Sequence, residues 1–387
     1  MHSGANGLEH ASGAAGDPGL PGLAAPDAVR RDHYLVLDGL RGFAAFAICL
    51  VHLAHISHHR LGDSLDRAFL AVDFFFVLSG VVIADRYEQQ LMAGSFVRAF
   101  LLRRAIRLYP MVALGTLAGL GVMLLGRWLH TGPAPRFAVL AAATLWNGLL
   151  LPLSSRPWWG WGLWPFNPPF WSLFCELVVN GLYALAILQL RGRRIVVPVA
   201  GAAAVLVWHC AQGGTLQQGG DATGLMIGMC RAVFGFGLGV IIVRLHAAGR
   251  LPKTGLPGGA AMVVLVLVLW GPFSRGWGAA YDLVAIMLVM PWIVMAGLRT
   301  GPVVHGARLY ATLGLISYPL YATHEVLFRM VLAVLLWRHH SGILVRDGSL
   351  VMLFVTAVVV SHALARFYDL PARAWLARRI IFRARPG

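Results

Sequence analysis

Stretches of about 20 mostly apolar residues recur along almost the whole chain, separated by short segments rich in arginine, glycine or proline. A helix of that length crosses ~30 Å of hydrocarbon. Charged residues make up only 12% of the 387 residues, about half of the ~25% typical of soluble domains. The sequence therefore predicts an all-α polytopic membrane protein. It excludes a soluble enzyme, a disordered chain and a disulfide-stapled secreted domain.

Eleven segments are candidates for the membrane. They lie near 37–58, 69–86, 108–128, 137–153, 170–190, 195–212, 223–243, 258–273, 279–298, 311–337 and 348–368. If all of them crossed, with the N-terminus inside, the basic groups at 191–194 and 244–253 would lie outside. If 137–153 is re-entrant or interfacial, most of the 32 basic residues fall inside, as the positive-inside rule requires. We therefore predict about ten transmembrane helices plus this one segment, with both termini cytoplasmic.

The predicted organisation is one membrane domain between two tails. Residues 1–33 are rich in Gly, Ala and Pro, which predicts a disordered cytoplasmic tail. Residues 34–371 are predicted to form the membrane domain, and residues 372–387 a basic cytoplasmic tail. The net charge of +16 comes from arginines at the ends of the apolar segments. This pattern excludes nucleic acid as a partner and indicates contact with membrane lipid. The Trp-dense stretch 158–171 and the 154–169 loop are expected outside, at the outer interface.

Few acidic residues lie in or beside the apolar segments, and each is a candidate for function because an ionisable group in hydrocarbon is costly. They are Asp38, Asp73, Glu176, Asp282 and Glu325. Asp282 stands next to a predicted outer loop, so we interpret it as part of a structural ion pair or as an interfacial group.

The first segment carries Arg41 and His52, eleven residues apart. That separation places them within ~20° of one another on a helix and ~16 Å apart along its axis. Gly39 and Gly42 would let another helix approach closely. With His55, His58 and His59, His52 also suggests a metal site. However, the last two fall in the outer loop and no acid or cysteine at ligand spacing completes the set, so no metal is predicted.

Two later segments carry stripes of polar residues on otherwise apolar helices. In one stripe the polar residues follow one another at intervals of 4, 4 and 3 residues, and in the other at intervals of 4 and 3 residues, so each stripe lies on one face of a helix. Such stripes can hold helices together, but together with Arg41 and His52 they favour a reaction or transport cavity. The stripes consist of Ser172, Glu176, Asn180 and Tyr183, and of Ser317, Tyr321 and His324.

Three arginines cluster at the mouth of the third segment. Arg103, Arg104 and Arg107 lie within about one helical turn. Each could be a plain positive-inside anchor. Together they form a fork suited to phosphate or pyrophosphate.

In combination and order, these motifs resemble the signature of the membrane acyltransferase-3 family. The resemblance runs from about 35 to 371. It rests on residues 38–42 followed by His52, on 72–80, on 103–107, on Trp171-Ser172-Leu173 with Glu176, on 314–324 and on 367–371. The last element carries Asp369 where the family pattern has Glu.

The resemblance implies an integral O-acyltransferase of the bacterial inner membrane. Members move an acyl group, usually acetyl from acetyl-CoA, to hydroxyls of cell-envelope or exported carbohydrates or of other small acceptors. Acetyl-CoA, or another acyl-CoA, would be a donor substrate, with no tightly bound cofactor. A homodimer is left open.

The same resemblance, joined to the chemistry of acyl transfer, assigns roles to the polar residues. His52 would be the base, and Arg41 would stabilise charge or anchor pantetheine. Glu176 would orient His52 or hold the acceptor. Arg103, Arg104 and Arg107 would bind the donor. The supporting polar cavity would contain Asp38, Asp73, Trp171, Ser172, Ser317, Tyr318, Tyr321 and His324.

Two alternatives use the same polar residues. A carrier for a glycan, a lipid-linked sugar or a proton-coupled solute would need such a cavity without acyl transfer, although the sequence lacks the internal repeat common in carriers. A metal transporter would use the histidines of the first segment.

Overall fold

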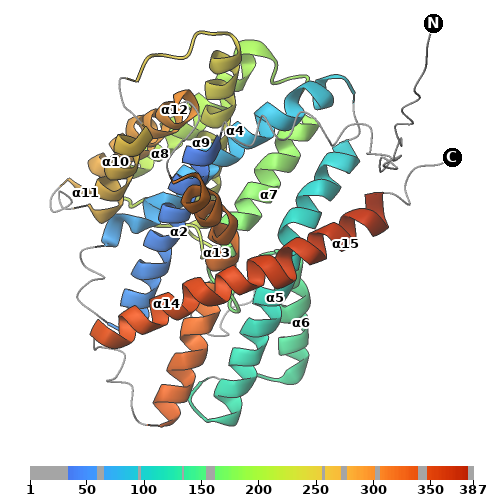
Figure 1. Cartoon of the computed structure of the whole chain (residues 1–387), viewed down its shortest axis with the longest axis vertical. Coiled ribbons are helices and arrows are strands. Elements are labelled where there is room, and N and C mark those ends of the chain that lie inside the picture. Colours follow the sequence, from blue (N-terminus) through green and yellow to red (C-terminus); the bar gives the residue numbers. More distant parts are fainter. Residues whose placement is uncertain are drawn as a thin grey trace, which may run out of the picture.

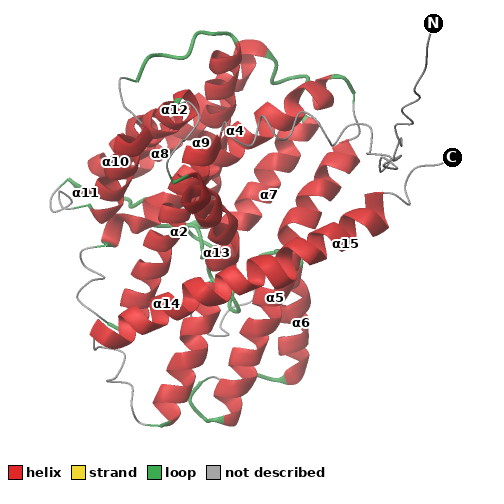
Figure 2. Cartoon of the chain, in the orientation of Figure 1, coloured by secondary structure: helices red, strands yellow, loops and turns green. Residues whose placement is uncertain are grey.

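A computed structural model describes residues 34–58, 65–94, 97–132, 135–153, 162–254, 258–271, 277–300, 306–338 and 347–381. Within these ranges all regular structure is helical (Figure 2), which confirms the predicted all-α fold class. The predicted tail 1–33 lies outside the described residues.

The helices follow one another in the order shown by Figure 1. They are α2 (Leu35–Ile56), α4 (Ala71–Met92), α5 (Val97–Trp128), α6 (Phe137–Gly148), α7 (Phe170–Leu185), α8 (Val196–Ala211), α9 (Leu225–Ala247), α10 (Gly258–Trp270), α11 (Gly278–Val284), α12 (Met290–Arg299), α13 (Ala307–Trp337), α14 (Asp347–Leu364) and α15 (Leu370–Ile381). Short 3-10 helices are η2 (Asp66–Leu70) and η3 (Gly192–Ile195), and π-helical turns are η4 (Ala285–Val289) and η6 (Ala365–Asp369).

Among the described residues, eight helical stretches are long and apolar enough to cross a membrane. They are Leu35–Ile56, Arg67–Met92, Val97–Trp128, Gly192–Ala211, Leu225–Ala247, Gly278–Arg299, Ala307–Trp337 and Gly348–Ile380. Three apolar helices are shorter: Phe137–Gly148, Phe170–Leu185 and Gly259–Trp270. Every predicted segment thus contains a helix, while the count of ten crossings stays a prediction.

The predicted non-crossing segment 137–153 contains α6, which lies beside α5 (Figure 1). With 12 residues, α6 measures ~18 Å at 1.5 Å per residue. Its last residue, Gly148, lies beside Thr116 in the middle of α5, and the Tyr109 hydroxyl donates to Leu149 O (3.2 Å). By itself, α6 is too short to cross the hydrocarbon.

Two pairs of helices, α2 with α13 and α4 with α9, run parallel and pack so closely that they fix the register of the bundle. A Cβ atom at Gly42 of α2 would lie 2.5 Å from Leu313 Cβ of α13, and one at Gly80 of α4 would lie 2.0 Å from Phe236 O of α9. Glycine is needed at both positions because the backbones approach so closely. The parallel direction agrees with a topology in which 137–153 does not cross. Eleven crossings would make both pairs antiparallel.

The C-terminal helices form one continuous path through α14, η6 and α15, which crosses the front of the bundle (Figure 1). The expected cytoplasmic tail from 372 onward therefore begins as helix, which continues to Ile381. Tyr368 of η6 donates to Pro110 O of α5 (3.0 Å), so this path is tied to the helix that carries the arginine cluster.

Candidate functional site

The segment before α7 is buried inside the bundle. Trp164, Phe166 and Asn167 are each at most 1% exposed, and Asn167 Nδ2 donates to Ala322 O of α13 (2.7 Å). Irregular backbone is tolerated at membrane depth where protein surrounds it. Residues 162–171 therefore pack against protein, and α7 begins inside the bundle, while the position of 158–171 at the outer side of the membrane stays a prediction. Residues 154–161 lie outside the described residues.

A cavity of about 110 Å³, which we call the arginine cavity, opens among α2, α4, α5, α7 and α13. Most of the predicted donor-side and supporting residues meet there. Its polar lining consists of Arg41, Ser79, Arg104, Arg107, Ser172, Glu176, Ser317, Tyr318 and Tyr321.

Glu176 lies in the arginine cavity and bonds to groups on α4 and α5. Its Oε1 forms an ion pair with buried Arg104 and accepts a hydrogen bond from Ser79 Oγ (2.9 Å). Of the two roles expected for Glu176, orienting His52 does not match these contacts, because Glu176 bonds to Arg104 and Ser79 instead. The cause is the buried segment 162–169, which moves the start of α7, and Glu176 with it, towards the end of the bundle that carries Arg41.

Arg41 is held by groups on its own helix and on α13. Its Nη2 contacts Asp38 Oδ1 (2.9 Å) and donates to Gly314 O (2.8 Å). Its Nε donates to Ser317 Oγ (2.9 Å). These bonds place the predicted residues Asp38 and Ser317 in direct support of Arg41.

The three predicted donor-binding arginines occupy different environments. Arg104 and Arg107 line the cavity, whereas Arg103 is exposed and lies outside it. Nearby, the Tyr318 hydroxyl donates to Leu108 O (2.5 Å), and Arg373 lies over the Tyr318 ring. Arg373 also forms an ion pair with Asp369. The aspartate in place of the family glutamate thus retains a charged partner close to the cavity wall.

A second polar cluster joins α2 and α13 and consists of His52, His324 and Glu325. His52 Nδ1 lies 3.0 Å from Glu325 Oε2 and 3.0 Å from His324 Nε2. Glu325 also contacts Arg329 (2.7 Å). The sequence showed Glu325 as an acid inside an apolar segment, directly after His324, but its pairing with His52 was not predicted.

The hydrogen bonds assign the protons in this cluster. His324 Nδ1 contacts Leu320 O (2.8 Å), which can only accept, so neutral His324 carries its hydrogen there and presents a lone pair at Nε2. His52 Nδ1 then donates towards Glu325 and His324. This leaves Nε2 of neutral His52 able to accept a proton.

The same three side chains offer ligand atoms within 4.8 Å of one another and could hold a metal ion. Only the histidines at 52–59 suggested a metal site from the sequence, and the two residues that α13 supplies were not predicted as ligands. The hydrogen bonds described above also connect the same three groups to one another without an ion.

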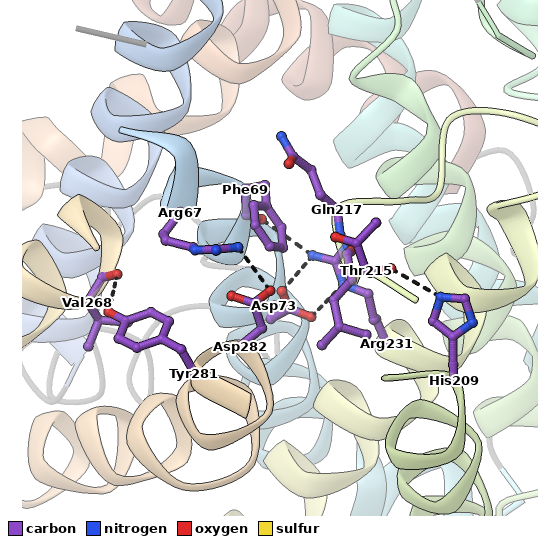
Figure 3. Close-up of polar contacts among 11 residues, drawn as sticks. Arg67, Phe69, Asp73, His209, Thr215, Gln217, Arg231, Val268, Tyr281 and Asp282 are labelled. Carbon is purple, nitrogen blue, oxygen red and sulfur yellow. Dashed lines mark hydrogen bonds and ion pairs between the residues drawn. The ribbon is translucent and has the colours of Figure 1, made fainter. Parts of the chain in front are cut away.

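A larger cavity of about 380 Å³, which we call the histidine cavity, is lined by His52, His55, Trp171 and Arg231 among others. The predicted residue Asp73 lies behind it and binds Arg231 through both carboxylate oxygens (2.9 and 2.6 Å; Figure 3). Arg231 also lies over the Trp171 ring (5.5 Å to the centroid). Sequence reasoning had left Arg231 without a role.

Figure 3 also shows Arg67 beside Asp282. Arg67 Nη1 lies 3.1 Å from Asp282 Oδ2, and the aspartate side chain is 1% exposed. The interpretation of Asp282 as part of a structural ion pair is confirmed.

The two cavities share Val72 and Tyr321 in their walls. The Tyr321 hydroxyl lies 2.5 Å from Ser172 Oγ and donates to Pro169 O (3.0 Å). Tyr321 therefore stands between a cavity rich in arginine and a cavity that contains the histidines.

Comparison with known proteins shows which family the chain belongs to. The family model described as "Acyltransferase domain" (acyltransferase-3) matches residues 34–366, so the chain belongs to this family of membrane acyltransferases. It is also similar to "Protein 2 in picA locus" of Rhizobium radiobacter, with 33% identity over 189 residues that cover 47% of this chain and 96% of the relative. No solved structure matches the chain.

Proposed function

We propose that the protein is an O-acetyltransferase that moves acetyl from acetyl-CoA to a hydroxyl of a cell-envelope or exported carbohydrate. The observation that carries this proposal is the shared wall at Tyr321 between the arginine and histidine cavities. Acyl transfer needs a cationic site for the donor and a base for the acceptor, placed so that the two substrates meet.

The donor would bind at the arginine cavity. Arg104 and Arg107, with Arg41 deeper inside, present guanidinium groups to the CoA phosphates. Arg107 supplies the net positive charge, because Glu176 and Asp38 pair with the other two arginines. The cavity of about 110 Å³ suits the narrow pantetheine arm, so the nucleotide would remain at its mouth. Because Arg41 and His52 are ~16 Å apart along α2, anchoring the arm is the better of the two roles expected for Arg41.

The acceptor would bind at the histidine cavity. His52 Nε2 removes the proton from the acceptor hydroxyl as its oxygen attacks the thioester carbonyl. The tetrahedral intermediate then collapses, the carbon–sulfur bond breaks, and the CoA thiolate takes the proton from His52. Glu325, 3.0 Å from His52 Nδ1, stabilises the imidazolium formed between these steps.

The positive-inside pattern supports a bacterial inner-membrane protein with cytoplasmic termini and the arginine cavity towards the cytoplasm, where CoA is found. The acceptor would then enter from outside.

Purified protein supplied with acetyl-CoA labelled in the acetyl group tests the proposal. We expect labelled acetyl on an added carbohydrate, or slow hydrolysis of the donor without one. A carrier would do neither, and translocation of a glycan by reconstituted protein with no acetyl chemistry would establish the alternative.

A further inference from the structure

The loop between α8 and α9, residues 212–224, forms a polar wall of the histidine cavity. Gln217, Gln218 and Asp221 line the cavity together with His52. Figure 3 shows Gln217 extending away from the side chains of Arg231 and Asp73, which lie beneath the loop. The mechanism proposed above uses none of these loop side chains.

The loop is held in place from below. Arg231, 1% exposed, donates through Nη1 to Leu216 O (2.7 Å) and Gln218 O (2.9 Å), while Asp73 neutralises its charge. Gly219 has φ +146°, and a Cβ there would lie 2.4 Å from the Trp171 ring. These contacts preorganise the wall, which reduces the ordering cost of binding a ligand.

The charge that remains on this wall is negative. Asp221 Oδ1 accepts hydrogen bonds from Thr223 Oγ1 (2.6 Å), Gly224 N (2.7 Å) and Thr223 N (2.9 Å). These bonds hold the pKa of the Asp221 carboxyl below its ordinary value, so the group is ionised at neutral pH. Arg231 adds no net charge because Asp73 pairs with it.

We propose that this loop selects the acceptor, taking an uncharged polyhydroxylated ring and rejecting one that carries an anionic group near Asp221. The inference rests on the proposed function and deepens it. Amides both donate and accept hydrogen bonds and a carboxylate accepts them, which suits neighbouring hydroxyls. The volume of about 380 Å³ lies within the ~300–1,000 Å³ of small-molecule sites.

Matched glycosides provide the test, with the full chain in detergent and acetyl-CoA as donor. We expect the wild type to bind and acetylate methyl glucoside in preference to methyl glucuronide. Asp221→Asn keeps the capping oxygen but removes the charge, and should raise the glucuronide-to-glucoside ratio of kcat/KM about fivefold, the size of one solvated like-charge contact. Gln217→Glu should lower that ratio.

Gln217→Ala and Gln218→Ala should weaken methyl glucoside binding. Gln212→Ala is the matched control, because Gln212 is exposed in the same loop and does not line the cavity. Equal use of both glycosides by the wild type, or unchanged ratios in Asp221→Asn and Gln217→Glu, would overturn the proposal. If neither glycoside binds while acetyl-CoA is still bound and hydrolysed, the proposal is also wrong, but the acetyltransferase function stands. Absence of all acetyl chemistry would instead refute the function.

Discussion

His52 of α2 and Glu325 of α13 place Nδ1 and Oε2 3.0 Å apart because the two helices pack in parallel. The close approach at Gly39 and Gly42 sets the register that brings these residues to the same depth. The same register brings Arg41 to Ser317 (2.9 Å). One helix pair therefore supplies groups to both cavities.

The first prediction concerns the base. His52→Ala should abolish acetyl transfer and leave acetyl-CoA binding nearly intact, because a general base acts mainly in the transition state. His55→Ala should have a mild effect, since His55 points about 60° away from His52 on a helix. Transfer and donor binding are measured on the same preparations. Equal losses in both variants would contradict the assignment.

The second prediction separates the roles of Glu325 and Glu176. Glu325→Gln should lower kcat by about 10²-fold or more, because His52 loses its charged partner, while acetyl-CoA affinity changes little. Glu176→Gln should mainly change acetyl-CoA affinity, because it leaves Arg104 without its carboxylate. Binding and single-turnover rates distinguish the two. The reverse pattern would restore Glu176 as the partner of His52.

The third prediction compares neighbouring arginines. Arg104→Ala or Arg107→Ala should weaken acetyl-CoA binding by about 1–3 kcal/mol, and lysine should restore only part of it because it lacks the bidentate fork. Arg103→Ala is the control, because Arg103 is exposed outside the cavity. Isothermal titration with acetyl-CoA measures the donor affinity of each variant and distinguishes these outcomes. Three equal losses would indicate a general charge effect.

Each of the eleven predicted apolar segments contains a helix, because a membrane span is specified locally by length and hydropathy, whereas the helix α15 that follows the last segment was not predicted. Helical periodicity likewise predicted that Ser172, Ser317 and Tyr321 face a polar cavity, and all three line the arginine cavity. The depth of α7 was not predictable, because it depends on the burial of Trp164 and Phe166 within the bundle, a tertiary effect.

Pairings between distant helices were also missed. The contacts of Glu325 with His52 and of Arg231 with Asp73 depend on helix register, which the sequence indicates only through glycines such as Gly42. The cost of an ionisable group in the membrane drew attention to Glu325 from the sequence, and the same signal could have drawn attention to Arg231.

The fourth prediction tests the register directly. Gly42→Ala introduces a Cβ that would lie 2.5 Å from Leu313 Cβ. The helices must separate or shift, which should cost about 1–3 kcal/mol and reduce transfer by moving His52 relative to Glu325. The thermal unfolding temperature, measured in detergent, and the transfer activity should both fall. Gly121→Ala, where an added Cβ meets nothing within 4 Å, should change neither.

The last prediction concerns topology. It uses two described positions that lie on opposite sides of the membrane if 137–153 does not cross, and on the same side if all eleven segments cross. Cysteines are introduced at Gln212, after α8, or at Arg103, near the start of α5, in a background without Cys49, Cys175, Cys210 and Cys230. With 137–153 not crossing, an impermeant thiol reagent should label position 212 in intact cells and position 103 only after permeabilisation.

If all eleven segments crossed, both positions would lie inside and both would need permeabilisation. A third cysteine at Ser155, in the predicted external loop but outside the described residues, should be labelled like position 212. Labelling of 212 from outside would also place the acceptor wall at 217–221 on the side opposite the arginine cluster. This is the geometry that transfer from an internal donor to an external acceptor requires.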